Sequence, residues 1–199
     1  MTTIHLTASE RFDDAEADAL AEALRKHFDV DGPHHLMRKA DLLPQFVQLL
    51  ADYKLWVALG LVASGFLTKI GQRAGDAVWD AIKERLKRKD AKPLADITDA
   101  LARARKAAGP TGFIRIGLDM PDDRFGTVLT IHDTEPEKIA YAIARFCAKA
   151  EDIAATLRTE IDGGRGPAVG VTVTLLEGDA VMLEWQNRSD LKKRQVRID

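Results

Sequence analysis

The sequence predicts an α+β fold in which a mainly helical N-terminal half is followed by an antiparallel sheet, with a long helix covering one face of that sheet. Three observations lead to this fold class. Apolar residues recur every three or four positions through most of residues 1–109. Gly109 and Pro110 then stop the helical pattern. After them polarity alternates along several short segments, so residues 110–199 are expected to form the order β-β-α-β-β-β.

The change at Gly109 and Pro110 also gives the expected domain organisation. Residues 1–109 form a mainly helical region with a short N-terminal strand and an apolar helix at 55–68, and residues 110–199 form an antiparallel α+β region. If the apolar helix packs against the sheet, the two regions make one continuous domain.

The N-terminal elements follow from capping and periodicity. Residues 3–7 alternate in polarity like a short strand. Asp13 and Glu16 then form the capping pattern of a first helix. Residues 42–90 are helical in pattern, and a last helix runs from Pro93 to the stop at Gly109.

The C-terminal elements follow from alternation around turn residues. Residues 113–119 and 125–132 predict one hairpin, and residues 169–185 predict a second around a glycine turn. Between the hairpins, a capping box at Thr134 starts a long helix over 135–162. Residues 191–198 are expected to form an edge strand, because cations on an edge discourage pairing with other edges.

The composition is that of an ordinary globular protein. The 199 residues are 46% hydrophobic and 30% charged, with a formal charge of −2 and one cysteine. This is too apolar for a disordered chain and has too few cysteines for a disulfide scaffold or a structural zinc site. The N-terminal residues lack the features of a signal peptide, and Cys147 has no partner cysteine, so a cytoplasmic protein is expected.

Residues 55–68 form an uncharged run that is apolar on all sides of a helix. Fourteen residues make about 21 Å of helix, which is short of the roughly 30 Å of a bilayer core, so a buried or interfacial helix is expected. Small residues spaced four apart allow close helix approach. The candidates for interaction or membrane contact are Trp56, Gly60, Ser64, Phe66, Gly71 and Gly75.

Residues 83–92 form a basic run with six cations and two acidic side chains. Such a run is either a solvated surface or a contact for anionic lipid beside an interfacial helix at 53–70. It contains no aromatic side chain, and the pI is near 6.2, so nucleic acid is not an expected partner. The electrostatic candidates are Lys83, Arg85, Lys87, Arg88 and Lys89.

The reactive side chains do not form a recognisable catalytic motif. Asp31, His34 and His35 share one loop, and such groups can bind a metal or act as a general base. Neighbouring histidines on an extended chain point in opposite directions, however, which does not favour one shared ion. Cys147 lies within a predicted helix and is expected to be a buried apolar thiol. No catalytic, cofactor-binding or metal residue is therefore assigned, and no cofactor is expected.

The sequence favours a non-enzymatic intracellular interaction or regulatory protein that uses helix 55–68 to form a homo-oligomer or to bind a protein partner. Two alternatives stay open. The first is a peripheral membrane protein that contacts the anionic inner face of a membrane through 53–70 and 83–92. The second is a small enzyme or metal binder that uses His34 and His35.

Overall fold

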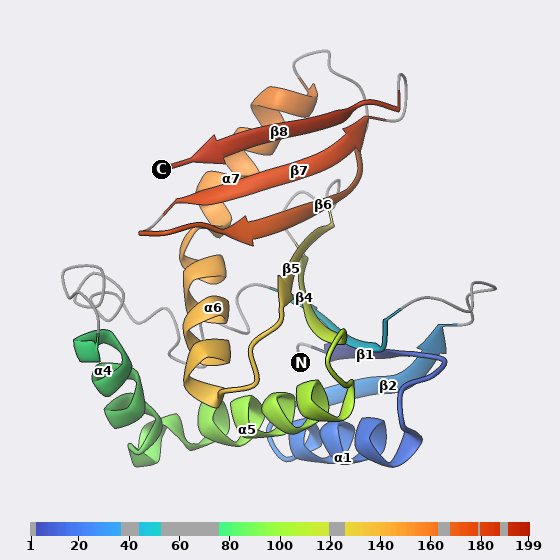
Figure 1. Cartoon of the computed structure of the whole chain (residues 1–199), viewed down its shortest axis with the longest axis vertical. Helices are drawn as coiled ribbons and strands as arrows, with labels where there is room; N and C mark the ends of the chain where they lie inside the picture. Colours follow the sequence, from blue (N-terminus) through green and yellow to red (C-terminus); the bar gives the residue numbers. More distant parts are fainter. Residues whose placement is uncertain are drawn as a thin grey trace.

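One mixed sheet organises the chain (Figure 1). The computed structural model describes residues 3–36, 44–52, 76–119, 126–162, 168–178, 180–187 and 191–199. Within these residues the sheet has eight strands in the order β2-β1-β3-β4-β5-β6-β7-β8. The strands are β1 (Thr3–Ser9), β2 (Asp29–Leu36), β3 (Phe46–Asp52), β4 (Phe113–Asp119), β5 (Thr127–Ile131), β6 (Ala168–Leu175), β7 (Val181–Asn187) and β8 (Lys193–Ile198).

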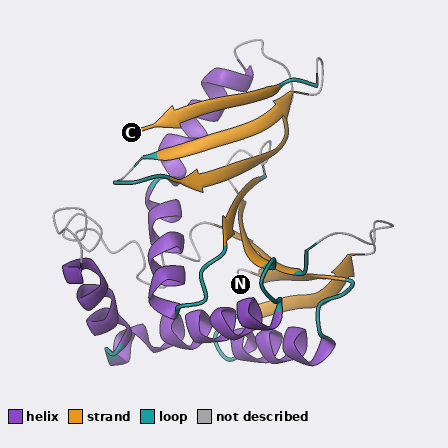
Figure 2. Cartoon of the chain, viewed as in Figure 1, coloured by secondary structure: helices purple, strands orange, loops and turns teal. Residues whose placement is uncertain are grey.

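The helices gather on one side of the twisted sheet (Figure 2). They are α1 (Asp14–Arg25), α4 (Asp76–Leu86), α5 (Lys92–Ala107), α6 (Pro136–Ala148) and α7 (Ala150–Leu157). The buried faces of α1, α5, α6 and α7 share one hydrophobic core with the sheet. Helix α4 instead packs through Ile82 against Ala140 of α6, on the outside of the helix layer. The expected α+β class is therefore confirmed, as a sheet with a helix layer on one face.

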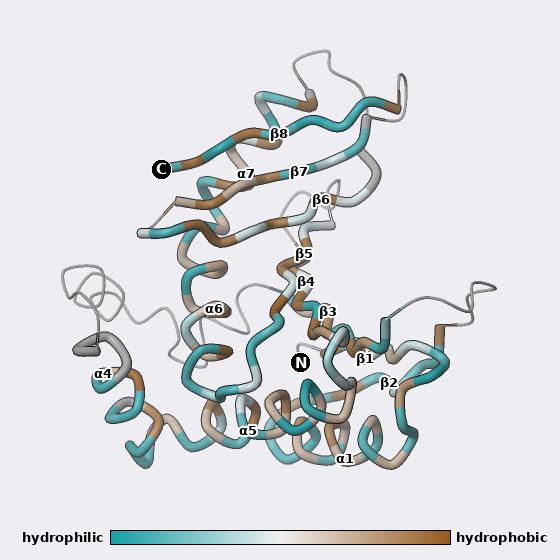
Figure 3. The backbone as a smooth tube through the Cα atoms, in the orientation of Figure 1, coloured by the Kyte–Doolittle hydropathy of each residue, from teal (hydrophilic) through white to brown (hydrophobic). Residues whose placement is uncertain are grey.

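The core face of the sheet is set by strand register. One row of buried or partly buried apolar side chains runs in register across every strand except the edge strand β2. Each side chain of this row belongs to the common core or packs against it. Hydrophobic positions accordingly concentrate along the central strands (Figure 3). The row comprises Leu6, Leu49, Ile116, Leu129, Val173, Leu183 and Val196.

The sheet is mixed, and the expectation of an antiparallel sheet is wrong for part of it. Strands β1 and β2, β3 and β4, and β5 and β6 pair in parallel. Each of these pairs has helices between its strands in the sequence, which give the chain the length that a parallel crossover requires. The two predicted hairpins, β4 with β5 and β6 with β7, are antiparallel as expected.

The expected mainly helical N-terminal half is also wrong, because it contains three strands, of which only the first was predicted. Asp31, His34 and His35 are expected to share a loop, yet all three lie in edge strand β2, which pairs with β1. Residues 46–52 were expected to be helical, yet they form β3, in which Val47, Leu49 and Ala51 face the core. A short apolar segment fits a helix or a strand, and here pairing with both β1 and β4 selects the strand.

The helix boundaries correct two further details. Asp13 accepts a hydrogen bond from the Glu16 amide at 3.0 Å, which confirms the predicted cap of α1. The capping box predicted at Thr134 is wrong, because Glu135 is the N-cap of α6 and its side chain makes no capping bond. The expected helix 135–162 is divided at Lys149 into α6 and α7, followed by a π-helical turn to Asp162.

The hydrophobic core contains residues from both predicted regions. Helix α5 ends at Ala107, Gly109 follows two residues later with a φ of +75°, and β4 begins at Phe113. Side chains on either side of this turn, such as Leu101 and Ile116, belong to the same buried cluster. The division into regions 1–109 and 110–199 stays a prediction.

Candidate functional site

The face of the sheet opposite the helix layer, here called the open face, has no described helix packed on it. Its side chains are identified by register, because paired residues on neighbouring strands share a face and alternate with the core-facing row. One open-face row crosses every strand. It comprises Asp31, His5, Leu50, Gly117, Val128, Thr172, Glu184 and Gln195.

At the β2 edge of the open face, one carboxylate joins two imidazoles. Asp31 Oδ2 lies 3.0 Å from His5 Nδ1, and Asp31 Oδ1 lies 2.9 Å from His34 Nε2. The three side chains are 51% to 61% exposed. Hydrogen bonds from His5 and then His34 hold the pKa of the Asp31 carboxyl below its ordinary value. We call these three residues the His-Asp cluster.

Local chain geometry builds the His-Asp cluster. Parallel pairing of β1 with β2 places Asp31 directly beside His5. The register then shifts, so that His34 pairs with Thr7 rather than continuing the regular step. Gly32 provides this shift with a φ of +118°, a backbone conformation that favours glycine. The carboxylate can therefore reach both imidazoles.

The structure separates the two histidines that the sequence singled out. His34 joins Asp31, whereas His35 Nε2 lies 3.4 Å from Asp14 at the start of α1. Sequence reasoning missed His5, although the alternation of residues 3–7 already placed it on the polar face of a strand. Within the described ranges, no group of three or more His, Cys, Asp or Glu side chains is arranged to hold a metal ion.

The chemistry available to the His-Asp cluster is proton transfer. A carboxylate fixes the orientation and tautomer of an imidazole that it contacts, and imidazole titrates near neutral pH. The cluster is thus a surface site at which one carboxylate orients two imidazoles.

The centre of the open face carries an aromatic stack. The Phe46 and Phe113 rings are parallel within 2°, with centroids 5.4 Å apart. The Arg115 guanidinium lies 5.0 Å from the Phe46 centroid and 5.1 Å from the Phe113 centroid, which is cation–π geometry. Phe46 is only 3% exposed, while Phe113, Leu50 and Val128 are partly exposed. The middle of the face therefore carries partly exposed apolar side chains beside the Arg115 guanidinium, between polar ends at β2 and β8.

Cys147 is a core residue. It lies on α6, is 4% exposed and belongs to the common hydrophobic cluster. Burial raises the pKa of its thiol, which opposes formation of the reactive thiolate. The prediction of a buried apolar thiol is confirmed.

The basic run surrounds the connection between α4 and α5. Lys83 lies on α4, Lys87 and Arg88 follow the end of that helix, and Lys89 begins a short 3₁₀ turn. All four side chains are exposed. Lys87 Nζ donates to Glu84 Oε1 at 3.0 Å. Arg85 belongs to α4, but its side chain is not among those that the structure describes.

The candidates on the apolar run lie outside the described residues, so the helix predicted at 55–68 is not tested. These candidates are Trp56, Gly60, Ser64, Phe66, Gly71 and Gly75. Among the helices that are described, none is long and apolar enough to cross a membrane.

The chain is thus an α+β protein with a mixed sheet, a helix layer on one face of the sheet and the His-Asp cluster on the other. Comparisons with protein-family models, curated proteins and solved structures found no match, so no activity is carried over from a relative.

Proposed function

We propose that this chain is a non-enzymatic cytoplasmic interaction protein that associates with a second copy of itself. The proposed contact uses the apolar segment 55–68, with Trp56 and Phe66 as its large side chains, together with the apolar centre of the open face. The observation that supports this most strongly is the one-sided helix layer, which leaves Leu50, Phe113 and Val128 partly exposed with no described helix over them. Apolar patches of this kind are typical of interfaces.

The burial and packing of Cys147, His27 and His132 also support a binding role. Cys147 is buried in the core. His27 Nε2 lies 3.0 Å from Asp96 Oδ2 and links α1 to α5, which is a structural contact between two helices. His132 packs edge-on against Phe113 with the ring centroids 5.9 Å apart. These groups serve packing and do not converge on a common point.

Charging the proposed contact is expected to weaken self-association. A carboxylate at Trp56 or Phe66 must lose its hydration when an apolar contact forms, at a cost of about 2 kcal/mol or more. The double variant Trp56→Asp with Phe66→Asp should therefore associate at least about 30-fold more weakly, as measured by analytical ultracentrifugation.

The matched control is Leu191→Asp, because Leu191 is 69% exposed and lies in the connection between β7 and β8. It makes the same change from apolar to acidic side chain away from the proposed contact. We expect its association to equal that of the natural sequence. If the double variant associates as strongly as the natural sequence, the proposal is contradicted. If Val128→Glu also weakens association, the open face takes part in the contact.

A second candidate function, acid–base chemistry, is favoured by the shared carboxylate of the His-Asp cluster. This candidate differs from the alternative based on His34 and His35. Asp31 contacts His5 and His34, whereas His35 lies beside Asp14. An enzyme of this kind requires Asp31 to stay ionised while it orients both imidazoles.

The titration of Asp31 tests this second candidate. Because imidazole hydrogen bonds stabilise the carboxylate, its pKa is expected below the ordinary aspartate value, and His5→Gln or His34→Gln should raise it. Carbon-13 NMR of the carboxyl group across acid pH measures both values. In His35→Gln, the matched control, the pKa of Asp31 should not change. An ordinary Asp31 pKa in the natural sequence would remove the basis for the candidate.

A further inference from the structure

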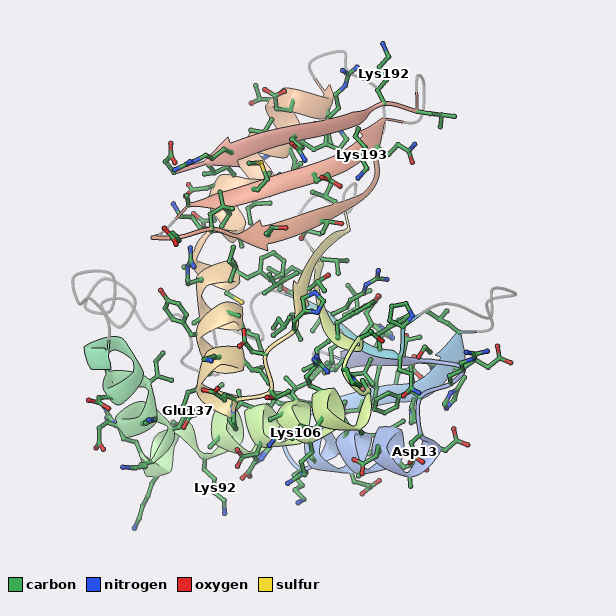
Figure 4. All side chains as sticks on the ribbon, in the orientation of Figure 1. Asp13, Lys92, Lys106, Glu137, Lys192 and Lys193 are labelled. Carbon is green, nitrogen blue, oxygen red and sulfur yellow. The ribbon has the colours of Figure 1, made fainter. Side chains whose placement is uncertain are left out.

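The connection between α4 and α5 gathers cations at the outside of the molecule. Lys83, Lys87, Arg88, Lys89 and Lys92 are all exposed, and we call this group the basic elbow. Helix α4 lies at the far edge of the helix layer (Figure 1), and Lys92 extends away from the body of the protein (Figure 4). The elbow is therefore a projecting charged surface.

Packing fixes the basic elbow in place. Ile82 is 2% exposed and packs on Ala140 of α6, with Ala81, Leu86 and Tyr141 around them. The apolar side of α4 is thus held against α6, and the lysines are left on its outer side. The first turn of α5 carries Lys92 directly after the 3₁₀ turn that begins at Lys89.

The charge of the elbow is only partly neutralised by its neighbours. Lys87 bonds to Glu84, and Arg88 has a contact of its own. Lys83, Lys89 and Lys92 make no ion pair with any side chain in the described part of the chain. Among the described side chains, none neutralises these three lysines.

We propose that the basic elbow docks onto a membrane surface that contains anionic lipid. Four of its five cations are lysines, whose mobile ammonium groups suit a fluid layer of headgroup charges. Recognition of nucleic acid favours the planar guanidinium of arginine and aromatic stacking, and residues 83–92 contain no aromatic side chain. Charge complementarity therefore points to lipid. The proposal goes beyond self-association and does not depend on it.

Each cation close to an anionic membrane strengthens binding by about fivefold, so five cations give weak and reversible binding. Neutralising Lys83, Lys89 and Lys92 together is expected to weaken that binding by about 100-fold. Charge screening gives a second signature. Raising salt from about 0.1 M to about 1 M shortens the Debye length from about 10 Å to about 3 Å, which should release the protein.

The experiment is cosedimentation of the full chain with vesicles of phosphatidylcholine alone or with about one third phosphatidylserine. The test variant is Lys83→Gln, Lys89→Gln and Lys92→Gln together. The matched control neutralises three exposed cations elsewhere in the helix layer, Lys26→Gln, Arg103→Gln and Lys106→Gln. Lys106 lies 14 residues beyond Lys92, about 21 Å along α5. Both variants change the net charge equally.

Salt-sensitive binding to phosphatidylserine vesicles, lost in the test variant and kept in the control variant, would support the proposal. Equal loss in both variants would overturn it, since net charge alone would then explain binding. Binding to pure phosphatidylcholine, or retention of the test variant in high salt, would overturn it in favour of apolar insertion. If the protein does not bind vesicles but binds a duplex oligonucleotide, and the test variant loses that binding, the basic elbow would be assigned to nucleic acid and the proposal would be overturned. The mass of each variant, measured in parallel, separates these results from any change in self-association.

Discussion

Replacing Arg105 with methionine is expected to lower the free energy of unfolding by about 3 kcal/mol. Arg105 is 7% exposed, and its guanidinium donates to the carbonyl oxygens of His132 at 2.9 Å, Gly109 at 2.7 Å and Pro110 at 3.5 Å. These bonds join the C-terminal end of α5 to the end of β5. Methionine fills similar space but cannot donate, so the carbonyl groups lose charged hydrogen-bond partners inside the protein.

Urea unfolding measures this loss, and Arg103→Met is the matched control. Arg103 lies on the same helix and is exposed, so its replacement should change the free energy of unfolding by no more than about 0.5 kcal/mol. If both variants unfold at the same urea concentration as the natural sequence, Arg105 does not hold α5 to the sheet as described.

Replacing Gly32 with alanine is the second substitution with a large expected effect, on the order of 3 kcal/mol. Gly32 has a φ of +118°, and a Cβ atom there would overlap the carbonyl oxygen of Leu6, a backbone atom of β1. The alanine must therefore push β2 away from β1. Because Gly32 lies between Asp31 and His34, the same shift should break the His-Asp cluster.

Gly178→Ala separates the steric effect from the cost of the backbone conformation. Gly178 has a φ of +69°, and a Cβ atom there would meet no heavy atom within 4 Å. We expect a loss of only about 1 kcal/mol, from conformation alone. Thermal unfolding compares the two variants, and an equal loss in both would show that β1 and β2 are not as closely packed at Gly32 as the structure indicates.

The elements that the sequence predicted well are those with a complete local signal. Strands β4, β6 and β7 alternate clearly around their turns, and β8 proved to be the charged edge strand that its cations suggested. The cap of α1 was likewise encoded within four residues. In these cases the side chains that define the element are neighbours in the sequence, so no knowledge of tertiary packing is needed.

The elements that were missed depend on distant partners. Strand β2 is an edge strand with exposed side chains on both faces, so it shows no apolar alternation. The parallel pairings each span a helical crossover, and no local pattern distinguishes them from antiparallel ones. Dependence on distant residues also explains why the sequence did not predict the His-Asp cluster. His5 and Asp31 are 26 residues apart in sequence and meet only because β1 and β2 pair in parallel.

Association of the chain with a second copy of itself is measured by the mass of the untagged natural protein in solution. Sedimentation equilibrium over a wide concentration range provides that mass. We expect the mass to rise with concentration from 21.9 kDa toward twice that value. A mass of 21.9 kDa at every concentration would contradict it.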